Sequence, residues 1–179
     1  MATAQQGPTP EFALGMREMM LDGIAREVEI TKKVLAAVPD DKADYRPDPH
    51  ARTARELAWH IANTDVWFLN SIAEGKFGME ESEHKPGTIA ELVEWYGTNM
   101  QSGIERVRTL TPQQLTTPID FMGAFNLPAI AYLGFLNNHS IHHRGELCTY
   151  LRPMGSKCPS VYGGSYDEPW QGAQAETAA

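Results

Sequence analysis

The stretch TARELAWHIANTDVWFLNSIAEG, residues 53–75, carries complete start and stop signals for one helix. It opens with Thr53 and Glu56, the Thr-x-x-Glu pattern of a capping box, in which each side chain accepts a hydrogen bond from the other residue's backbone N–H. It closes at Gly75, a residue type common just after a helix C-terminus. The sequence therefore predicts a helix from about residue 53 to residue 74.

Three further segments show the apolar period of an amphipathic helix. One covers residues 11–38 and has a methionine-rich face that we expect to lie in the core. Another follows Thr88, which repeats the Thr-x-x-Glu cap, and has the sequence IAELVEWYGTNMQSGIERVRTL. The last is expected from about 127 to 152, because Pro128 is tolerated in a first helical turn and the next proline ends the helix.

Four helices of about twenty residues, with almost no alternating strand pattern, predict an all-α protein, an up-down four-helix bundle. The link that begins at Thr111 is rich in Gly and Pro, so we expect an irregular connection with a little extended structure around TPIDFMG. A C-terminal coil follows the last helix. We expect one domain over residues 11–170, between flexible tails over 1–10 and 171–179.

The composition excludes several classes of partner. With 15 Lys and Arg against 23 Asp and Glu, the formal net charge is -8, so we expect no nucleic-acid partner. No run approaches the roughly 18 apolar residues of a membrane span, and we see no signal peptide, so a soluble, cytoplasmic protein is expected. Cys148 and Cys158 are expected as reduced thiols rather than a disulfide.

Two histidines of the last predicted helix are spaced so that both can bind the same ion. His139 and His143 are four residues apart, which leaves them about 40° from eclipsed and one turn apart, so both rings can reach one ion. The same arc carries apolar and aromatic residues, namely Tyr132, Leu136, Leu147 and Tyr150. On such a buried face, two neutral imidazoles need hydrogen-bond partners or a metal.

A third histidine lies on the apolar face of another helix. His60 shares its arc with Leu57, Thr64, Trp67 and Phe68. It is a hydrogen-bonded core histidine or, together with His139 and His143, part of a three-histidine metal site with an open position. His142 could replace one ligand, but we expect it at the exposed edge of the helix.

The remaining two histidines, His50 and His84, are expected in solvated loops.

These residues resemble the DinB superfamily, the YfiT-like metal-dependent four-helix bundles. The resemblance rests on ELAWHIAN, on HSIHHRGELCTYLRPMG about eighty residues later, on the lead-in VPDDKADYRPDPHARTARELAWH and on the closing PSVYGGS, and covers about residues 11–168. It implies one divalent ion per chain, zinc or nickel, bound by His60, His139 and His143. It also implies a homodimer.

Glu146 departs from the family pattern, because many members have Gln at this position. It could be a fourth ligand, a hydrogen-bond partner that holds an imidazole N–H, or a surface acid, and it is the one acid that we can place near the ion for acid–base work. A substrate pocket is predicted around Thr64, Trp67, Tyr132 and Tyr150, although ordinary core packing would also explain these residues. Arg144 is expected to anchor the closing coil or a subunit interface.

Three functions are open for a bundle with such a site. Some family members are thiol transferases, in which a low-molecular-weight thiol is activated at the metal and attacks an electrophile. A metal-dependent hydrolase is the alternative enzyme, and a non-catalytic, stress-associated dimeric bundle is the third possibility. A di-iron carboxylate bundle is disfavoured, because it needs Glu-x-x-His on two helices whereas His143 and Glu146 stand in the reverse order.

Overall fold

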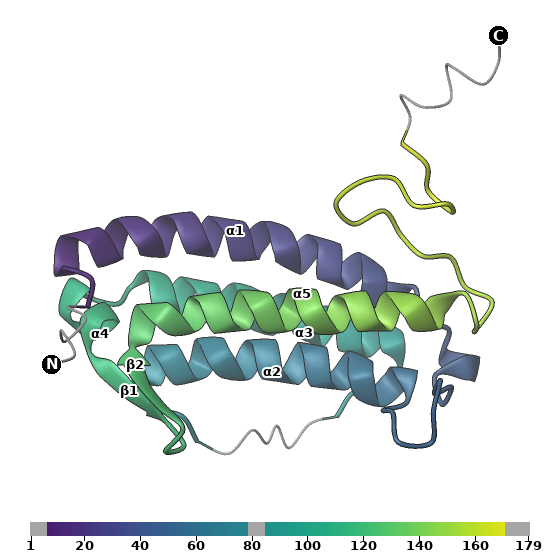
Figure 1. Cartoon of the computed structure of the whole chain (residues 1–179), viewed down its shortest axis with the longest axis horizontal. Helices are drawn as coiled ribbons and strands as arrows, with labels where there is room; N and C mark the ends of the chain where they lie inside the picture. Colours follow the sequence, from purple (N-terminus) through teal and green to yellow (C-terminus); the bar gives the residue numbers. More distant parts are fainter. Residues whose placement is uncertain (1–6, 79–84, 171–179) are drawn as a thin grey trace, which may run out of the picture.

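The computed structural model describes residues 7–78 and 85–170. Four long helices lie side by side as a bundle, and a short helix and a β-hairpin lie at one end (Figure 1). The long helices are α1 (Pro10–Ala36), α2 (Ala54–Glu74), α3 (Ile89–Arg108) and α5 (Tyr132–Leu151). The all-α four-helix bundle expected from the sequence is therefore confirmed.

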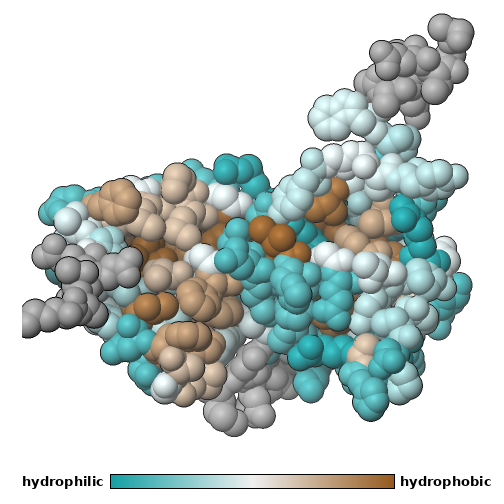
Figure 2. Space-filling view, in the orientation of Figure 1, coloured by the Kyte–Doolittle hydropathy of each residue, from teal (hydrophilic) through white to brown (hydrophobic). Residues whose placement is uncertain are grey.

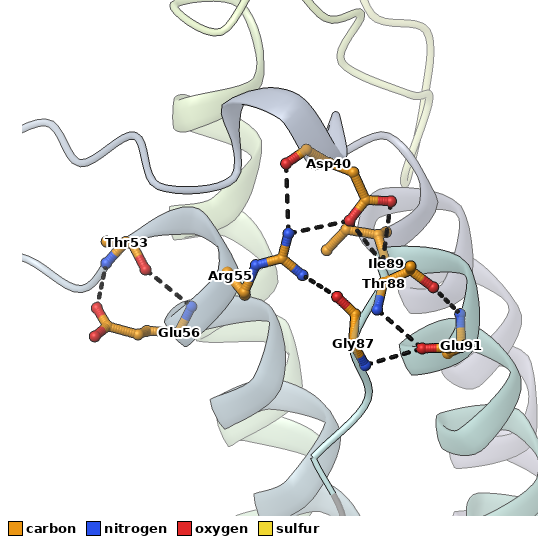
Figure 3. A network of polar contacts seen from close by, with 8 residues as sticks. All are labelled: Asp40, Thr53, Arg55, Glu56, Gly87, Thr88, Ile89 and Glu91. Carbon is orange, nitrogen blue, oxygen red and sulfur yellow. Dashed lines mark hydrogen bonds and ion pairs between the residues drawn. The ribbon is translucent and has the colours of Figure 1, made fainter.

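Both predicted capping boxes are formed (Figure 3). The Thr53 hydroxyl accepts from the Glu56 N–H at 3.1 Å, and the Glu56 carboxylate accepts from the Thr53 N–H at 2.7 Å. Thr88 and Glu91 make the same pair of bonds at 3.2 and 3.0 Å. At its other end α2 stops at Gly75, which has a φ of 70° that favours glycine.

Asp40, in the short 3-10 helix Asp40–Lys42 after α1, joins the starts of α2 and α3 (Figure 3). Its carboxylate accepts from the Ile89 N–H at 3.0 Å and from the Arg55 guanidinium at 3.1 Å. Arg55 also donates to the Gly87 carbonyl at 3.1 Å. The N-termini of α2 and α3 therefore lie at the same end of the bundle.

The helices do not alternate strictly in direction. Helix α2 packs between α3 and α5, and α1 also packs against both α3 and α5. Because α2 and α3 start together, they are parallel, and α1 and α5 run together in the opposite direction (Figure 1). The order is up, down, down, up. The connection from Gly75 to Thr88 allows this, since at about 3.3 Å per extended residue it can cross the roughly 30 Å length of a 20-residue helix.

The link between α3 and α5 contains helix α4 (Pro112–Thr116) and an antiparallel hairpin of β1 (Pro118–Phe121) and β2 (Phe125–Pro128). Strand β1 confirms the extended structure predicted near TPIDFMG. The helix expected from about residue 127 begins only at Tyr132. Leu127 instead pairs with Ile119 in the hairpin, and the Tyr132 hydroxyl donates to the Ile119 carbonyl at 2.7 Å, which anchors the hairpin to the helix.

The methionine-rich face of α1 is only partly buried. The buried residues of α1 are Ala13, Leu21, Ile24, Val28, Thr31, Val34 and Leu35, and none of them is a methionine. Phe12 and Met19, two of the apolar residues in this segment, are 62% and 69% exposed. Figure 2 shows apolar side chains gathered at this end of the molecule, over the start of α1 and the hairpin. None of the described helices is long and apolar enough to cross a membrane.

Arg144 anchors the closing coil, one of the two roles expected from the sequence. Its side chain is 1% exposed and pairs with the Glu27 carboxylate of α1 at 2.6 Å. It also donates to the Thr31 hydroxyl at 3.0 Å and to the hydroxyl of Tyr162 in the coil. The coil is therefore held against α1 and α5 through a buried charge.

Helices α2 and α3 approach closely at Gly103, where an added Cβ would lie 2.8 Å from the Leu69 Cβ. We expect Gly103→Ala to lower the free energy of unfolding by about 1–3 kcal/mol, because the two backbones must move apart. Gly15→Ala is the matched control, since nothing lies within 4 Å of an added Cβ there. That control should gain up to about 1 kcal/mol from helix propensity. Urea unfolding measures the stability of both variants. A Gly103→Ala variant as stable as Gly15→Ala would contradict the close approach.

Candidate metal centre

Three histidine rings meet between the antiparallel helices α2 and α5. The Nε2 atom of His60 lies 3.2 Å from Nε2 of His143 and 3.1 Å from Nε2 of His139. One ring nitrogen from each residue lies within 4.8 Å of the other two, which is the arrangement of a possible metal site. The side chains of His139 and His143 are 15% and 16% exposed, so the cluster is partly buried but still reached by solvent.

The partners of the opposite ring nitrogens determine which atoms carry hydrogen. Nδ1 of His139 lies 2.9 Å from Asp65 Oδ1, and Nδ1 of His143 lies 2.9 Å from Glu146 Oε2. A carboxylate accepts, so both Nδ1 atoms are the donors and both Nε2 atoms of the neutral rings carry lone pairs. Nδ1 of His60 contacts the Thr64 hydroxyl at 3.2 Å. This arrangement aims the lone pairs at a common point.

The donor set fits a divalent cation. One N–H of His60 can satisfy only one of the two facing Nε2 atoms at a time, whereas an ion satisfies all three lone pairs. Zinc–nitrogen bonds of about 2.0–2.1 Å in a tetrahedral site separate two ligand nitrogens by about 3.3 Å, close to the observed separations of 3.1 and 3.2 Å. Histidine ligands held by carboxylates are also the usual arrangement at metal centres.

Electrostatics keep His60 and His143 in the neutral form that binds metal. Burial, the Arg52 charge and the neighbouring histidines lower the pKa of His60 to about 4. Burial also lowers the pKa of His143, against the hydrogen bond to Glu146. Near neutral pH both rings are therefore neutral, so metal binding does not have to deprotonate an imidazolium.

Asp65, which the sequence reasoning missed, supports His139 from the core. It is fully buried, and its second oxygen accepts from the Tyr96 hydroxyl of α3 at 3.0 Å. Burial raises the pKa of Asp65, and the hydrogen bonds with His139, Ser140 and Tyr96 oppose this shift. An acidic residue inside the apolar run that follows His60 was the signal that could have identified it.

Of the three roles considered for Glu146, its contacts match the second, a hydrogen-bond partner that holds an imidazole N–H. One oxygen accepts from Nδ1 of His143, and the other accepts from the Tyr150 hydroxyl at 3.3 Å. Both oxygens are therefore engaged, and the carboxylate fixes the orientation of the His143 ring.

The residues of the predicted pocket lie in different environments. Thr64 contacts His60, and Trp67 is half-buried and donates to the Gly78 carbonyl at 3.1 Å. Tyr132 and Tyr150 are buried, the first beneath the hairpin and the second against Tyr45. The pocket itself stays a prediction.

The other described histidines, His50 and His142, and the two cysteines do not belong to the three-histidine group. His142 is exposed at the helix edge, as expected, and His50 is exposed in a loop. His84 falls outside the described residues. Cys148 and Cys158 are free, and burial together with Cys158 raises the pKa of the Cys148 thiol to about 12, so it is not an activated thiolate.

The fold and the cluster define a class, the four-helix bundles that bring histidines from two helices to one candidate metal site. The chain belongs to the DinB family, whose model matches residues 13–176.

Two curated relatives come from Bacillus subtilis strain 168, and both are described as uncharacterized proteins. YjoA is 29% identical over 133 residues, which is 70% of this chain and 82% of YjoA. YrdA is 24% identical over 144 residues, 79% of this chain and 85% of YrdA.

Two solved structures described as DinB-like proteins share the fold. The B. subtilis YjoA structure has a TM-score of 0.67 at 24% identity and covers 80% of this chain and 97% of its own. The protein from Bacillus cereus ATCC 10987 has a TM-score of 0.70 at 27% identity and covers 81% and 97%.

Asp65 offers a direct test of how the cluster is supported. We expect Asp65→Asn to weaken zinc binding about 10- to 100-fold, because the amide holds the His139 N–H less strongly than a carboxylate. Asp22→Asn is the control, since Asp22 is exposed on α1 and, within the described residues, pairs with Arg108. Competition with a zinc chelator measures both affinities, and circular dichroism checks folding. Equal affinities would show that Asp65 serves packing alone.

The lowered pKa of His60 predicts a pH dependence of the metal-free protein. An unfolded histidine takes up a proton near pH 6.5, whereas folded His60 does so only near pH 4. Between these values the unfolded chain binds more protons, so stability falls as the pH is lowered from about 6.5 to about 4. Other groups titrate in the same range, so wild type is compared with His60→Gln by urea unfolding after chelation. The variant should show the smaller loss, and equal losses would refute this prediction.

Proposed function

We propose that this chain binds one divalent ion, zinc or nickel, through His60, His139 and His143, and transfers a low-molecular-weight thiol to an electrophile. The observation that carries the proposal is the meeting of three Nε2 atoms whose opposite ring nitrogens are held by Asp65, Glu146 and Thr64. Neutral imidazoles leave the ion its positive charge, and both zinc and nickel accept such ligands.

The bound ion would supply Lewis acidity that keeps a substrate thiol in its nucleophilic thiolate form near neutral pH. The chain's own contribution is to hold the three rings rigidly. Asp65 fixes His139 from the core side, Glu146 fixes His143 from the solvent side, and Thr64 contacts His60 within its own helix. The partial exposure of the cluster leaves a route for a small substrate.

The engagement of both carboxylates favours thiol transfer over hydrolysis. Hydrolysis of an ester or amide gains from a free general base beside the attacking water. Asp65 is buried behind His139 and bonded to Tyr96, and Glu146 is bonded to His143 and Tyr150. A thiol that has already lost its proton needs no such base. The homodimer implied by the family resemblance remains a proposal, which sedimentation would test.

The ligand assignment predicts the metal content of tag-free protein loaded with one equivalent of zinc or nickel. Wild type should hold about one ion per chain by elemental mass spectrometry. His60→Ala, His139→Ala and His143→Ala should each lose it, because two imidazoles bind weakly, while His142→Ala keeps it. Wild-type protein that stays metal-free after loading would refute the proposed site.

The loaded protein is then assayed with glutathione, cysteine or coenzyme A together with monochlorobimane, and with p-nitrophenyl esters without thiol. We expect thiol-dependent turnover that disappears with His60→Ala. Ester turnover without thiol would favour the hydrolase. No turnover in either assay across both metals would favour a non-catalytic metal-binding bundle.

A further inference from the structure

A second group of possible metal ligands lies on a single turn of α5, beside the first. His142, His143 and Glu146 each offer a ligand atom, and these three atoms lie within 4.8 Å of one another. The ring centroids of His142 and His143 are 4.7 Å apart, with the rings nearly perpendicular at 71°. His142 is exposed, so the group opens directly to solvent.

Glu146 brings an oriented negative charge to this group. Its Oε2 atom lies 2.9 Å from Nδ1 of His143, and its Oε1 atom accepts from Tyr150. Burial acts to raise the pKa of Glu146. The hydrogen bond and charge of His143 act against burial, as do the Tyr150 hydroxyl and the nearby His142, and the pKa of Glu146 is lower than usual. The carboxylate is thus ionised and faces two imidazoles from its own helix.

We propose that His142, Glu146 and Nδ1 of His143 form a second, weaker site for a divalent cation that accepts imidazole and carboxylate ligands, such as Zn²⁺. His142 and Glu146 are four residues apart and therefore lie on one face of the helix. His143 presents Nε2 to the three-histidine cluster and Nδ1 to this group, so the two sites share one ring through different atoms. No ligand from α2 is needed, which separates this site from the proposed function.

The weaker affinity follows from three features of the site. The ion must displace the proton that Nδ1 of His143 shares with Glu146, so that bond is given up. The proton is released to solvent, and the ring becomes an imidazolate when both sites are filled. His142 is exposed and loses side-chain freedom when it becomes a ligand. A first ion on the same imidazole repels the second. Excess metal would therefore fill this site last and release Glu146 from its role in orienting His143.

The test is equilibrium dialysis of the tag-free full chain against buffered free zinc, from nanomolar to millimolar, with zinc per chain measured by elemental mass spectrometry. Wild type should bind in two steps, the second at a free zinc concentration at least 10-fold higher. His142→Ala should lose only the second step. His60→Ala should lose the tight step and keep the weak one, because all ligands of the second site are on α5. His50→Ala, an exposed loop histidine, is the control and should keep both.

A second readout uses the histidine ring signals in nuclear magnetic resonance, where those of His142 should shift only during the weak step. Saturation of wild type after the tight step alone, or two-step binding by His142→Ala, would overturn the proposal. So would loss of the weak step in His60→Ala. A weak step without a tight one in wild type would support this site while refuting the proposed three-histidine centre.

Discussion

The structure depends on one buried carboxylate, that of Asp65. A charge with no solvent exposure costs several kcal/mol unless its hydrogen bonds are made. Here the bonds come from the Tyr96 hydroxyl on α3 and from His139 on α5, while Asp65 itself belongs to α2. Three helices must therefore reach one relative register before this group is satisfied. That same register brings His139 opposite His60, so the packing of the bundle and the geometry of the cluster have a common cause.

Helix α1 joins the same system through a second set of buried polar groups. The Thr31 hydroxyl lies 3.3 Å from the Ser140 hydroxyl, which in turn hydrogen-bonds to Asp65. Arg144, one turn further along α5, adds the ion pair with Glu27 and the bond to Thr31. Polar contacts thus run through the interior across all four long helices. A purely apolar core would tolerate sliding of one helix along another, whereas these contacts specify one arrangement.

Local signals in the sequence accounted for the boundaries of α2 and α3 and for the histidine spacing. Thr53 and Thr88 cap their helices through neighbours three residues away, so no tertiary information was needed. The direction of α3 depends on contacts such as Arg55 with Gly87, which join residues 32 positions apart. Asp65 was missed for the same reason, because its partners lie on other helices. The start of α5 was placed too early because the apolar residues of β2 pair with β1, an interaction that helical periodicity does not represent.

The proposed metal site also has a consequence for how the chain would acquire its ion. His60 and His143 are 83 positions apart in the sequence, so their ring nitrogens meet only after α2 and α5 have docked. An ion that needs all three histidines binds the native chain and not the unfolded one, and its binding energy adds to native stability, by about 2.7 kcal/mol at a free concentration one hundred times the Kd. Metal supply would then govern how long the protein survives proteolysis, independently of any reaction it carries out. The amount of such a protein would then rise and fall with the concentration of metal around it.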